Sequence, residues 1–482
     1  MEKFCDCLIN ILKVVMCVLI GILTITSFAF LVKLSSGDVP GIFLVLEFGT
    51  LVVGSVIIFL NIKSRYKIGI LLLLALILRA FWIITVKTMP VSDFATMYET
   101  ASNVLAGNFE GMNGYGYLGR FPHLVPMTLY ISGIMKIFGD NTLVALKILN
   151  VLFSTATLYL LYILAGYFIK SEKSKLFVIL IGAIFPAFIT YTSVLCTENV
   201  AIPLYIATLI LFFKSKELSG LKQIAYFLLT GVMLAFSNLF RGVAIVFLIA
   251  FLIYLVLCTK KRRIVNSLSV VGGYLTVTVV ISAILISLGV IERPLWAGTE
   301  PSYATLLLKG SNFENNGMWN YEDANFVEEH LRDENLAKLC IEKVEERILS
   351  KSPSELILFY AKKFASQWSA GDASGTYWAY VGANINMKSI VSVEFQLIYA
   401  IIMLLAFVGV FRSGNNSLVC IILFGFIMLF DIIETQPRYS YIIVFAFVLL
   451  AGQGLELISD FIKRERKNGS KSKKFLGKYF FK

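Results

Sequence analysis

The polar residues that could do chemistry occur in a few short segments between long apolar runs. In Val91-Ser92-Asp93-Phe94 the Asp93 carboxylate is placed to act as a general base, which would take a proton from an attacking hydroxyl. Tyr98 lies in the helical stretch that follows and runs to Gly107. The same pattern also fits Ser92 or Asp93 capping the N-terminus of that helix, and the spacing alone leaves both interpretations open.

A second segment is Gly119-Arg120-Phe121-Pro122-His123. Arginine offers paired donors that suit a phosphate, so Arg120 is a candidate for binding one. His123 could donate to an oxyanion or contact an acceptor. The alternative is a headgroup-facing arginine beside a surface histidine, with no part in binding a substrate.

Glu198 lies in a third segment, Thr197-Glu198-Asn199, which opens an apolar helix. Its carboxylate could orient the acceptor or join Asp93 in binding a metal ion. Thr and Glu at this position also cap a helix and complement its dipole, so capping remains the competing interpretation.

Two further cations, Arg241 and Arg438, complete the set, the second within Gln436-Pro437-Arg438-Tyr439. Both are expected on the outer side of a membrane, against the usual bias that places basic residues in the cytoplasm, which favours an anionic ligand. Anchoring at the membrane interface is the alternative.

The elements that hold these segments are predicted to be membrane-spanning helices. The 482 residues are 58% hydrophobic and only 15% charged, which excludes a soluble enzyme, a fibrous chain and a disordered chain. Since a span needs about 20 apolar residues, the sequence predicts an all-α polytopic membrane protein with about 12 transmembrane helices. They are expected at residues 8–34, 40–62, 68–86, 142–169, 175–192, 199–213, 222–238, 242–258, 264–290, 392–411, 417–434 and 438–462.

The apolar stretch at 122–138 decides the sidedness of the chain. If it crosses the membrane, the strong basic cluster at 260–263 and the basic loop at 63–67 fall on opposite sides. If it lies on or dips into the membrane surface, all the basic loops share one side, as the positive-inside rule requires. We therefore predict a juxtamembrane helix there and both termini in the cytoplasm. The basic loops that then share one side lie at 63–67, 170–175, 214–222, 260–263 and Arg412.

The net charge of +12 is explained by the basic loops and tail on the cytoplasmic side, so it does not predict a nucleic-acid partner. The segment 463–482 carries nine Lys or Arg and one Glu, which is typical of a cytoplasmic tail on anionic lipid. Seven scattered cysteines and two histidines predict neither a disulfide framework nor a His-rich metal centre.

Two hydrophilic segments, 87–141 and 291–390, are predicted on the outer side. The second holds helical patterns at 322–349 and 353–368 and is interpreted as a small, mostly helical module that covers or shapes a site. The centres of the helices from 142 to 290 carry no ionisable residue, whereas a secondary transporter would be expected to hold polar groups near the midplane. This distribution favours a reaction centre at the outer surface, reached by a lipid-borne substrate.

The order of these motifs resembles the C-type (GT-C) membrane glycosyltransferases, which include the protein O-mannosyltransferases and the aminoarabinose transferase of lipid A. The resemblance runs from about residue 68 to 462. Its motifs are Ser92-Asp93-Phe94, Tyr98, Ala106-Gly107, Arg120-Phe121-Pro122-His123, Phe138-Gly139, Thr197-Glu198-Asn199, Asn238-Leu239-Phe240-Arg241, the stretch from Gly310 to Asn320, the stretch from Ser352 to Trp368, and Gln436-Pro437-Arg438-Tyr439.

The resemblance implies an inverting transferase whose donor is a sugar on a polyprenyl phosphate. Asp93 matches the catalytic acidic residue of the first outer loop, and Glu198 matches the carboxylate of the second. Arg241 and Arg438 match positions available to the lipid phosphate. The other residues expected to bind substrate are Arg120, His123, Tyr98 and Tyr439.

The sequence departs from the family at two places. It has a single Asp93 where the eukaryotic mannosyltransferases have an Asp-Glu pair, so no cofactor is certain and a divalent metal stays possible. Two helices within 1–67 precede the core, where the family usually has one. The domains expected are these two helices, a transmembrane core at 68–290 with the catalytic loop 87–141, the module at 291–390, the C-terminal helices at 391–462, and the tail at 463–482.

The sequence therefore predicts transfer of a sugar to the hydroxyl of an extracytoplasmic acceptor at a bacterial plasma membrane, with Asp93 as base. The composition favours a Gram-positive cell-wall polymer, such as a teichoic acid or a polysaccharide, and a protein acceptor is the closest competitor. Membrane lipids are the other partners. The alternative functions are a lipid-linked saccharide flippase or transporter, and a non-catalytic scaffold of an envelope assembly complex.

Overall fold

The computed structural model describes residues 2–34, 39–259, 262–386, 392–412 and 417–468. Within these ranges the chain forms helices and no strand. In the same ranges nine helices are long and apolar enough to cross a membrane, or ten if one bent pair is a single span, and two shorter apolar helices accompany them. The predicted class, an all-α polytopic membrane protein, is confirmed, although the number of spans depends on the bent pair and the two short helices.

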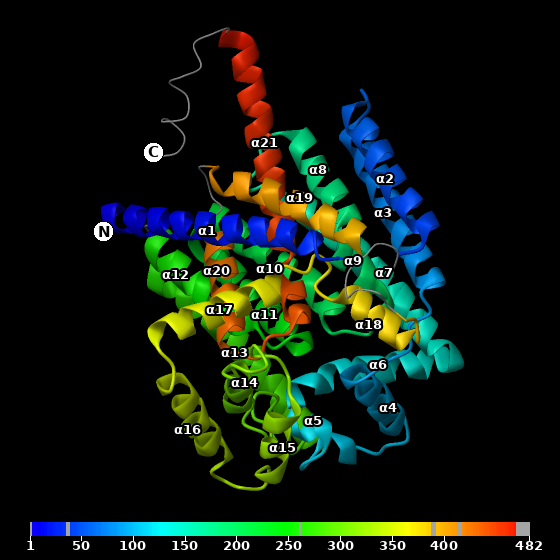
Figure 1. Cartoon of the computed structure of the whole chain (residues 1–482), viewed down its shortest axis with the longest axis vertical. Coiled ribbons are helices and arrows are strands. Elements are labelled where there is room, and N and C mark those ends of the chain that lie inside the picture. The colour runs from blue at the N-terminus through cyan, green and yellow to red at the C-terminus, as the bar shows by residue number, and fades with distance from the viewer. Residues whose placement is uncertain (1, 35–38, 260–261, 387–391, 413–416, 469–482) are drawn as a thin grey trace.

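The apolar helices follow the predicted runs closely and pack into one bundle (Figure 1). They are α1 (Glu2–Leu31), α2 (Gly41–Phe59), α3 (Ser64–Thr85), α7 (Thr142–Ala165), α8 (Glu172–Ile184), α9 (Pro186–Thr190), α10 (Glu198–Glu217), α11 (Gly220–Phe240), α12 (Ala244–Cys258), α13 (Arg263–Ser287), α19 (Val393–Val410), α20 (Ser417–Ile432) and α21 (Phe445–Asn468).

Two predicted helices are interrupted in the structure. The run at 175–192 is broken between α8 and α9, which are bent by 59°. Pro186 lacks the amide hydrogen that a continuous helix needs and disfavours helical geometry at the residue before it. The run at 438–462 begins instead with a 3-10 turn, η5 (Pro437–Ile443), and becomes α-helical only at Phe445. Both interruptions deliver polar residues to the same region of the molecule, as described below.

Arg79 of α3 stabilises the first interruption and is fully buried. Its Nη1 donates to Ala183 O at 3.1 Å and its Nη2 donates to Gly182 O at 2.9 Å. Its Nε donates to Ser154 Oγ at 2.8 Å. The last carbonyls of a helix have no partner within it and form the negative end of its dipole, so this cation satisfies the end of α8.

Several of the basic loops lie at one end of the bundle, as their side-chain contacts show. The Lys173 ammonium lies 4.5 Å from the centre of the Phe59 ring, which joins the start of α8 to the end of α2. Arg412 donates to Asp460 at 2.8 Å, so the loop after α19 lies beside the C-terminal part of α21. That end of α21 is opposite α15 (Tyr321–Glu329) and α16 (Leu336–Leu349) in Figure 1. Residues 260–261 of the predicted basic cluster, and 469–482 of the tail, lie outside the described residues.

The loop between α3 and α7, residues 87–141, forms several short helices at the other end. The stretch 122–138 forms η2 (Pro122–Leu124) and α6 (Val125–Phe138), and η3 (Gly139–Asn141) separates it from α7. Helix α6 packs against α4 (Asp93–Leu105) as well as α7. The remaining elements of this loop are η1 (Glu110–Met112) and α5 (Tyr117–Arg120).

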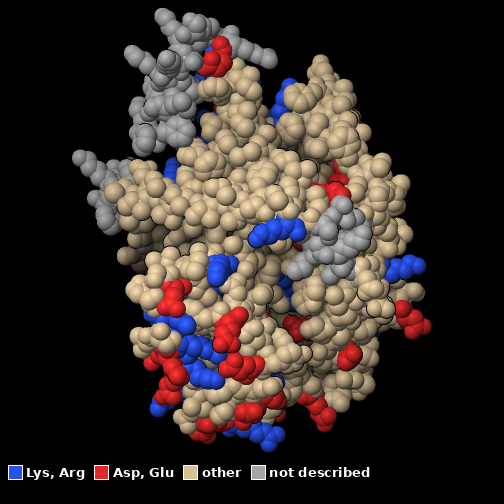
Figure 2. Space-filling view, in the orientation of Figure 1, with Lys and Arg blue, Asp and Glu red and all other residues tan. Residues whose placement is uncertain are grey.

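The segment after α13 divides between a small separate core and the main one. Helices α14 (Ser302–Gly310), α15 and α16 share a core made of Ala304, Leu308, Val327, Leu331, Leu336 and Cys340. Two helices, α15 and α16, therefore replace the single pattern expected at 322–349. Helices α17 (Pro353–Trp368) and α18 (Gly375–Gly382) bury residues in the main core. Figure 2 shows acidic and basic side chains gathered over the end that holds α14–α16, with a largely uncharged band beside it.

Candidate active site

Asp93 is the first residue of α4 and is partly buried. The Ser92 side chain does not cap this helix; its hydroxyl instead lies 3.4 Å from Asp93 Oδ1, to which it donates. Ser92 has a φ of 53°, a region that favours glycine, so the backbone is strained directly before the carboxylate. Strain of this kind is found where the surrounding structure fixes a side chain for function.

Four other groups lie around Asp93. The Tyr117 hydroxyl donates a hydrogen bond to its carboxylate, and burial together with Asp93 raises the pKa of Tyr117 well above its usual value, which keeps the hydroxyl protonated. His123, Glu434 and Arg438 are also close enough to Asp93 to interact with its charge. Residues 345 positions apart in the sequence therefore meet at one place.

Glu198 is held at the start of α10 by the turn that follows the broken span. The Asn199 amide donates to Tyr191 O and Val194 O, both at 2.9 Å, and so closes this turn. The Thr197 hydroxyl donates to Glu198 Oε2 at 3.1 Å. With 0% of its surface exposed, Glu198 is a fully buried carboxylate, and a helix-capping role alone would not require that burial.

Arg241 and Arg438 flank the Glu198 carboxylate. Arg241 Nη1 lies 3.5 Å from Glu198 Oε1, and Arg438 Nε lies 3.8 Å from the same oxygen. Among the described residues neither Glu198 Oε1 nor Arg438 Nε has a hydrogen-bond partner. The Arg438 guanidinium also lies 5.0 Å from the Phe94 ring centre and 5.6 Å from that of Trp378. One carboxylate at these distances does not saturate the N–H donors of two guanidinium groups, so the pair can still bind an anion.

Tyr439 belongs to the same cluster, whereas Tyr98 and Arg120 have other surroundings. Arg241 lies 5.1 Å from the Tyr439 ring centre. Tyr98 is partly buried in the middle of α4. Arg120 is bound by two carboxylates: its Nη2 donates to Glu300 at 2.7 Å and its Nη1 donates to Glu328 at 2.8 Å. Its guanidinium therefore joins the loop 87–141 to the segment after α13.

Further hydrogen bonds strengthen this junction. Thr299 N donates to Gly119 O at 3.1 Å, and the Thr299 hydroxyl donates to Gly114 O at 3.0 Å. A Cβ at Gly298 would lie 1.9 Å from Arg120 O, so only glycine allows this approach. The loop 87–141 is thus fixed to residues 298–300 by backbone contacts as well as by an ion pair.

Sequence reasoning singled out most of the residues in this cluster but missed two of its members. Tyr117 was not a candidate, although it lies three residues before Arg120 in the same short helix. Glu434 was not a candidate either, although it is an ionisable residue at the end of the apolar run 417–434. It is 5% exposed and lies 3.6 Å from the Lys309 ammonium. Burial raises the pKa of its carboxyl, and Lys309 opposes this shift.

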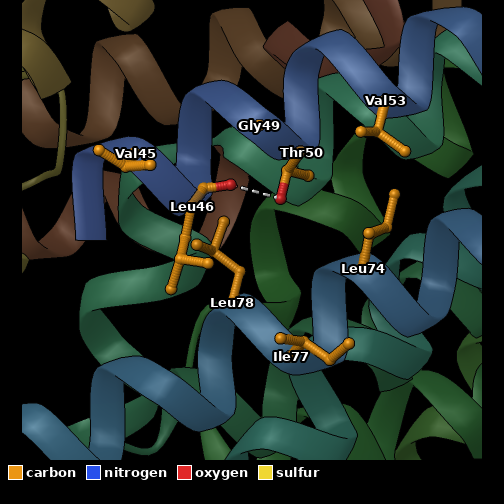
Figure 3. Close-up of a pocket in the computed structure, with 8 residues that line it drawn as sticks. All are labelled: Val45, Leu46, Gly49, Thr50, Val53, Leu74, Ile77 and Leu78. Carbon is orange, nitrogen blue, oxygen red and sulfur yellow. Dashed lines mark hydrogen bonds between the residues drawn. The ribbon is translucent and has the colours of Figure 1, made fainter. Parts of the chain in front are cut away.

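No metal-binding cluster is found in the part of the chain that the structure describes. No three His, Cys, Asp or Glu side chains there lie together in a way that could hold an ion. An apolar pocket lies elsewhere, between α2 and α3, lined by Val45, Leu46, Gly49, Thr50, Val53, Leu74, Ile77 and Leu78 (Figure 3). Thr50 is the polar side chain that lines this pocket, and its hydroxyl already donates a hydrogen bond to Leu46 O at 2.8 Å.

Comparison with known proteins bears on the residues around Glu198. Residues 123–286 match the family described as dolichyl-phosphate-mannose-protein mannosyltransferase. The match supports a glycosyltransferase of the GT-C type. The matched segment contains His123, Glu198 and Arg241, and it lies between Asp93 and Arg438 in the sequence. No curated protein matches the chain.

Proposed function

We propose that the protein transfers a sugar from a polyprenyl-phosphate donor to the hydroxyl of an extracytoplasmic acceptor, with inversion at the anomeric carbon. The observation that carries this proposal is the meeting of a half-buried carboxylate, Asp93, with two cations that share one buried counter-ion. A carboxylate suits the acceptor hydroxyl, and the two arginines suit the phosphate that leaves.

In the proposed reaction the Asp93 carboxylate takes the proton of the acceptor hydroxyl as its oxygen attacks the anomeric carbon. The bond between that carbon and the phosphate oxygen breaks, and its electron pair leaves with the phosphate. Arg241 and Arg438 stabilise the charge that grows on this group. Fixed charges of this kind lower the barrier because they need no reorganisation during the reaction.

Glu198 has an electrostatic role in this scheme. It keeps the two arginines in place before the donor binds, and it leaves part of their hydrogen-bonding capacity open. His123 lies near both Asp93 and Arg241 and is proposed to contact the acceptor or the developing oxyanion. Tyr98, Arg120 and Tyr439 remain proposed contributors to substrate binding.

The proposed location is the outer face of a bacterial plasma membrane, with both termini in the cytoplasm. In its support, the basic loops after α2 and α19 and the C-terminal part of α21 lie away from α14–α16, which stand beside the site (Figure 1). The proposed acceptor is a cell-envelope glycopolymer, and a protein is the competing acceptor.

The test is a transfer assay with purified protein, radiolabelled polyprenyl-phosphate sugars and a panel of glycopolymer and protein acceptors. Asp93→Asn is expected to lower transfer at least 100-fold, whereas Asp140→Asn, an exposed carboxylate of the same loop, should leave it unchanged. Equal transfer by the wild type and Asp93→Asn would refute the mechanism. Transport of the lipid-linked sugar across vesicles without transfer would favour a flippase instead.

A further inference from the structure

The segment from Glu434 to Gln436 is fixed from two sides by its backbone. Thr435 N donates to Gly317 O at 2.7 Å, in the loop after α14. Gln367 of α17 makes both bonds to the backbone of Gln436: its Nε2 donates to the carbonyl at 2.8 Å, and its Oε1 accepts from the amide at 2.9 Å. The positions of Thr435 and Gln436 are therefore fixed by backbone hydrogen bonds and do not depend on their own side chains.

Two side chains of this segment, Thr435 and Gln436, each have a polar atom without a partner among the described residues. Thr435 is 3% exposed, and its hydroxyl has no hydrogen bond among the described residues. The Gln436 Oε1 atom is also buried and without a partner there. Burying an unpaired polar atom destabilises a fold, and most such atoms in proteins are paired, so two in adjacent residues require an explanation.

This segment lies beside the groups proposed to act on the donor. Arg438 follows Gln436 by two residues, and Glu434 interacts with the charges of both Asp93 and Arg438. In a sugar phosphate the ring hydroxyls begin one carbon away from the bond that joins the sugar to phosphate. A segment next to both the base and the phosphate-binding arginine is therefore placed to face the sugar ring.

We infer that Thr435 and Gln436 recognise hydroxyl groups of the transferred sugar and so determine which sugar is accepted. This inference rests on the proposed function and adds a specificity element to it. The side-chain Oε1 of Gln436 accepts a hydrogen bond from one hydroxyl of the sugar ring. The Thr435 hydroxyl forms a hydrogen bond with a second ring hydroxyl. A site built to bind a hydroxyl rejects an analogue that lacks it, because its own polar groups then stay unpaired.

Binding assays with two nearly isosteric variants test the inference. Thr435→Val and Gln436→Met remove the polar atoms and retain the backbone bonds, and Thr435→Ser keeps the hydroxyl as a matched control. The ligands are polyprenyl phosphate, which has no sugar, and polyprenyl phosphates carrying mannose, glucose, galactose or N-acetylglucosamine. Each is titrated against the full-length protein in detergent.

The expected result is a 5- to 10-fold loss of affinity for the best sugar-bearing lipid in each of the two variants, the size that one lost hydrogen bond gives. Affinity for polyprenyl phosphate should stay within twofold, and Thr435→Ser should match the wild type. An equal loss for both kinds of lipid would assign the residues a structural role and overturn the inference. No loss for either would overturn it as well.

The two proposals fail in different ways. If the wild type transfers sugar and both variants bind the sugar-bearing lipid as well as the wild type does, only the sugar-recognition inference is wrong. If the wild type binds polyprenyl phosphate and its sugar-bearing forms equally and transfers no sugar, the proposed function is wrong, and the inference falls with it.

Discussion

Replacing Glu198 with glutamine is expected to destabilise the protein and, at the same time, to increase the stabilisation that a lipid phosphate provides. Glu198 is the buried counter-ion that Arg241 and Arg438 share. Its removal leaves Arg241 and Arg438 without the carboxylate that lies within 4 Å of both. A polyprenyl phosphate would then supply the missing charge.

The distances give the size of the effect. At 3.5 Å and 3.8 Å, the attractions of Glu198 to Arg241 and Arg438 are about 5 and about 4 kcal/mol at an effective dielectric constant of about 20. Solvation of the free charges and local relaxation offset part of this sum. Removing one member of a buried ion pair costs about 3–5 kcal/mol, and we expect a loss of stability in that range.

The assay is thermal unfolding of the purified protein in detergent, with and without a saturating concentration of polyprenyl phosphate. Glu217→Gln is the matched control, because Glu217 lies at the other end of α10 in an exposed pair with Lys214. Exposed pairs of this kind contribute about 0–1 kcal/mol, so this variant should unfold like the wild type.

Two results would refute the reasoning. If Glu198→Gln unfolds at the same temperature as the wild type, Glu198 is not the counter-ion of the two arginines. If the variant is destabilised but the lipid phosphate raises the unfolding temperature of both proteins equally, the arginines do not bind the phosphate.

Three further predictions concern the scaffold around the site. Arg79→Met should lower stability by about 3 kcal/mol or more, because it leaves the carbonyls at the end of α8 without donors, and thermal unfolding in detergent measures the loss. Gly273→Ala should disrupt the packing of α11 on α13, because a Cβ at this position would lie 2.2 Å from Leu228 O. Gly272→Ala should be tolerated, because nothing lies within 4 Å of a Cβ there. Protein yield and size-exclusion profiles compare the two variants. Burial raises the pKa of Asp372 to about 6. The folded state thus binds the proton of the Asp372 carboxyl more tightly than the unfolded state does, which stabilises the fold at low pH by up to about 3 kcal/mol. This stabilisation should be lost as the pH rises from about 4 to about 6, and unfolding measured at a series of pH values tests it.

Each of these predictions has a result that contradicts it. Wild-type stability of Arg79→Met would show that the end of α8 needs no cation. Equal behaviour of Gly272→Ala and Gly273→Ala would show that α11 and α13 do not approach closely. Asp372→Asn should lack the part of the pH dependence described above, and an unchanged pH profile in this variant would assign that dependence to another group.

The fold class and most of the site followed from the sequence because both depend on local patterns. Apolar runs of about 20 residues identify spans without knowledge of their packing. The sequence singles out Asp93, Glu198, Arg241 and Arg438 because ionisable residues are energetically costly inside a membrane. Each such residue at the end of a span therefore requires an explanation. The resemblance to a known family then related these residues to one reaction.

The remaining features could not be predicted because they depend on tertiary contacts. Arg120 suits a phosphate by its chemistry, but only the fold places Glu300 and Glu328 beside it. Tyr117 is one of 22 tyrosines, and nothing in its local sequence directs it to Asp93. Arg79 is a lone cation inside the apolar run at 68–86 and was not among the candidate residues. Its partners are carbonyl groups, which no side-chain pattern reveals.

The separation of the site residues along the chain affects how the protein is made. Asp93 and Glu198 are synthesised before Arg438, which follows Asp93 by 345 residues. At about 5–20 residues per second, the ribosome needs roughly 20–70 s to bridge that interval. During this time Glu198 has only Arg241 as a counter-ion. The proposed anion-binding pair is complete only after η5 has been synthesised, so the proposed activity cannot precede that step.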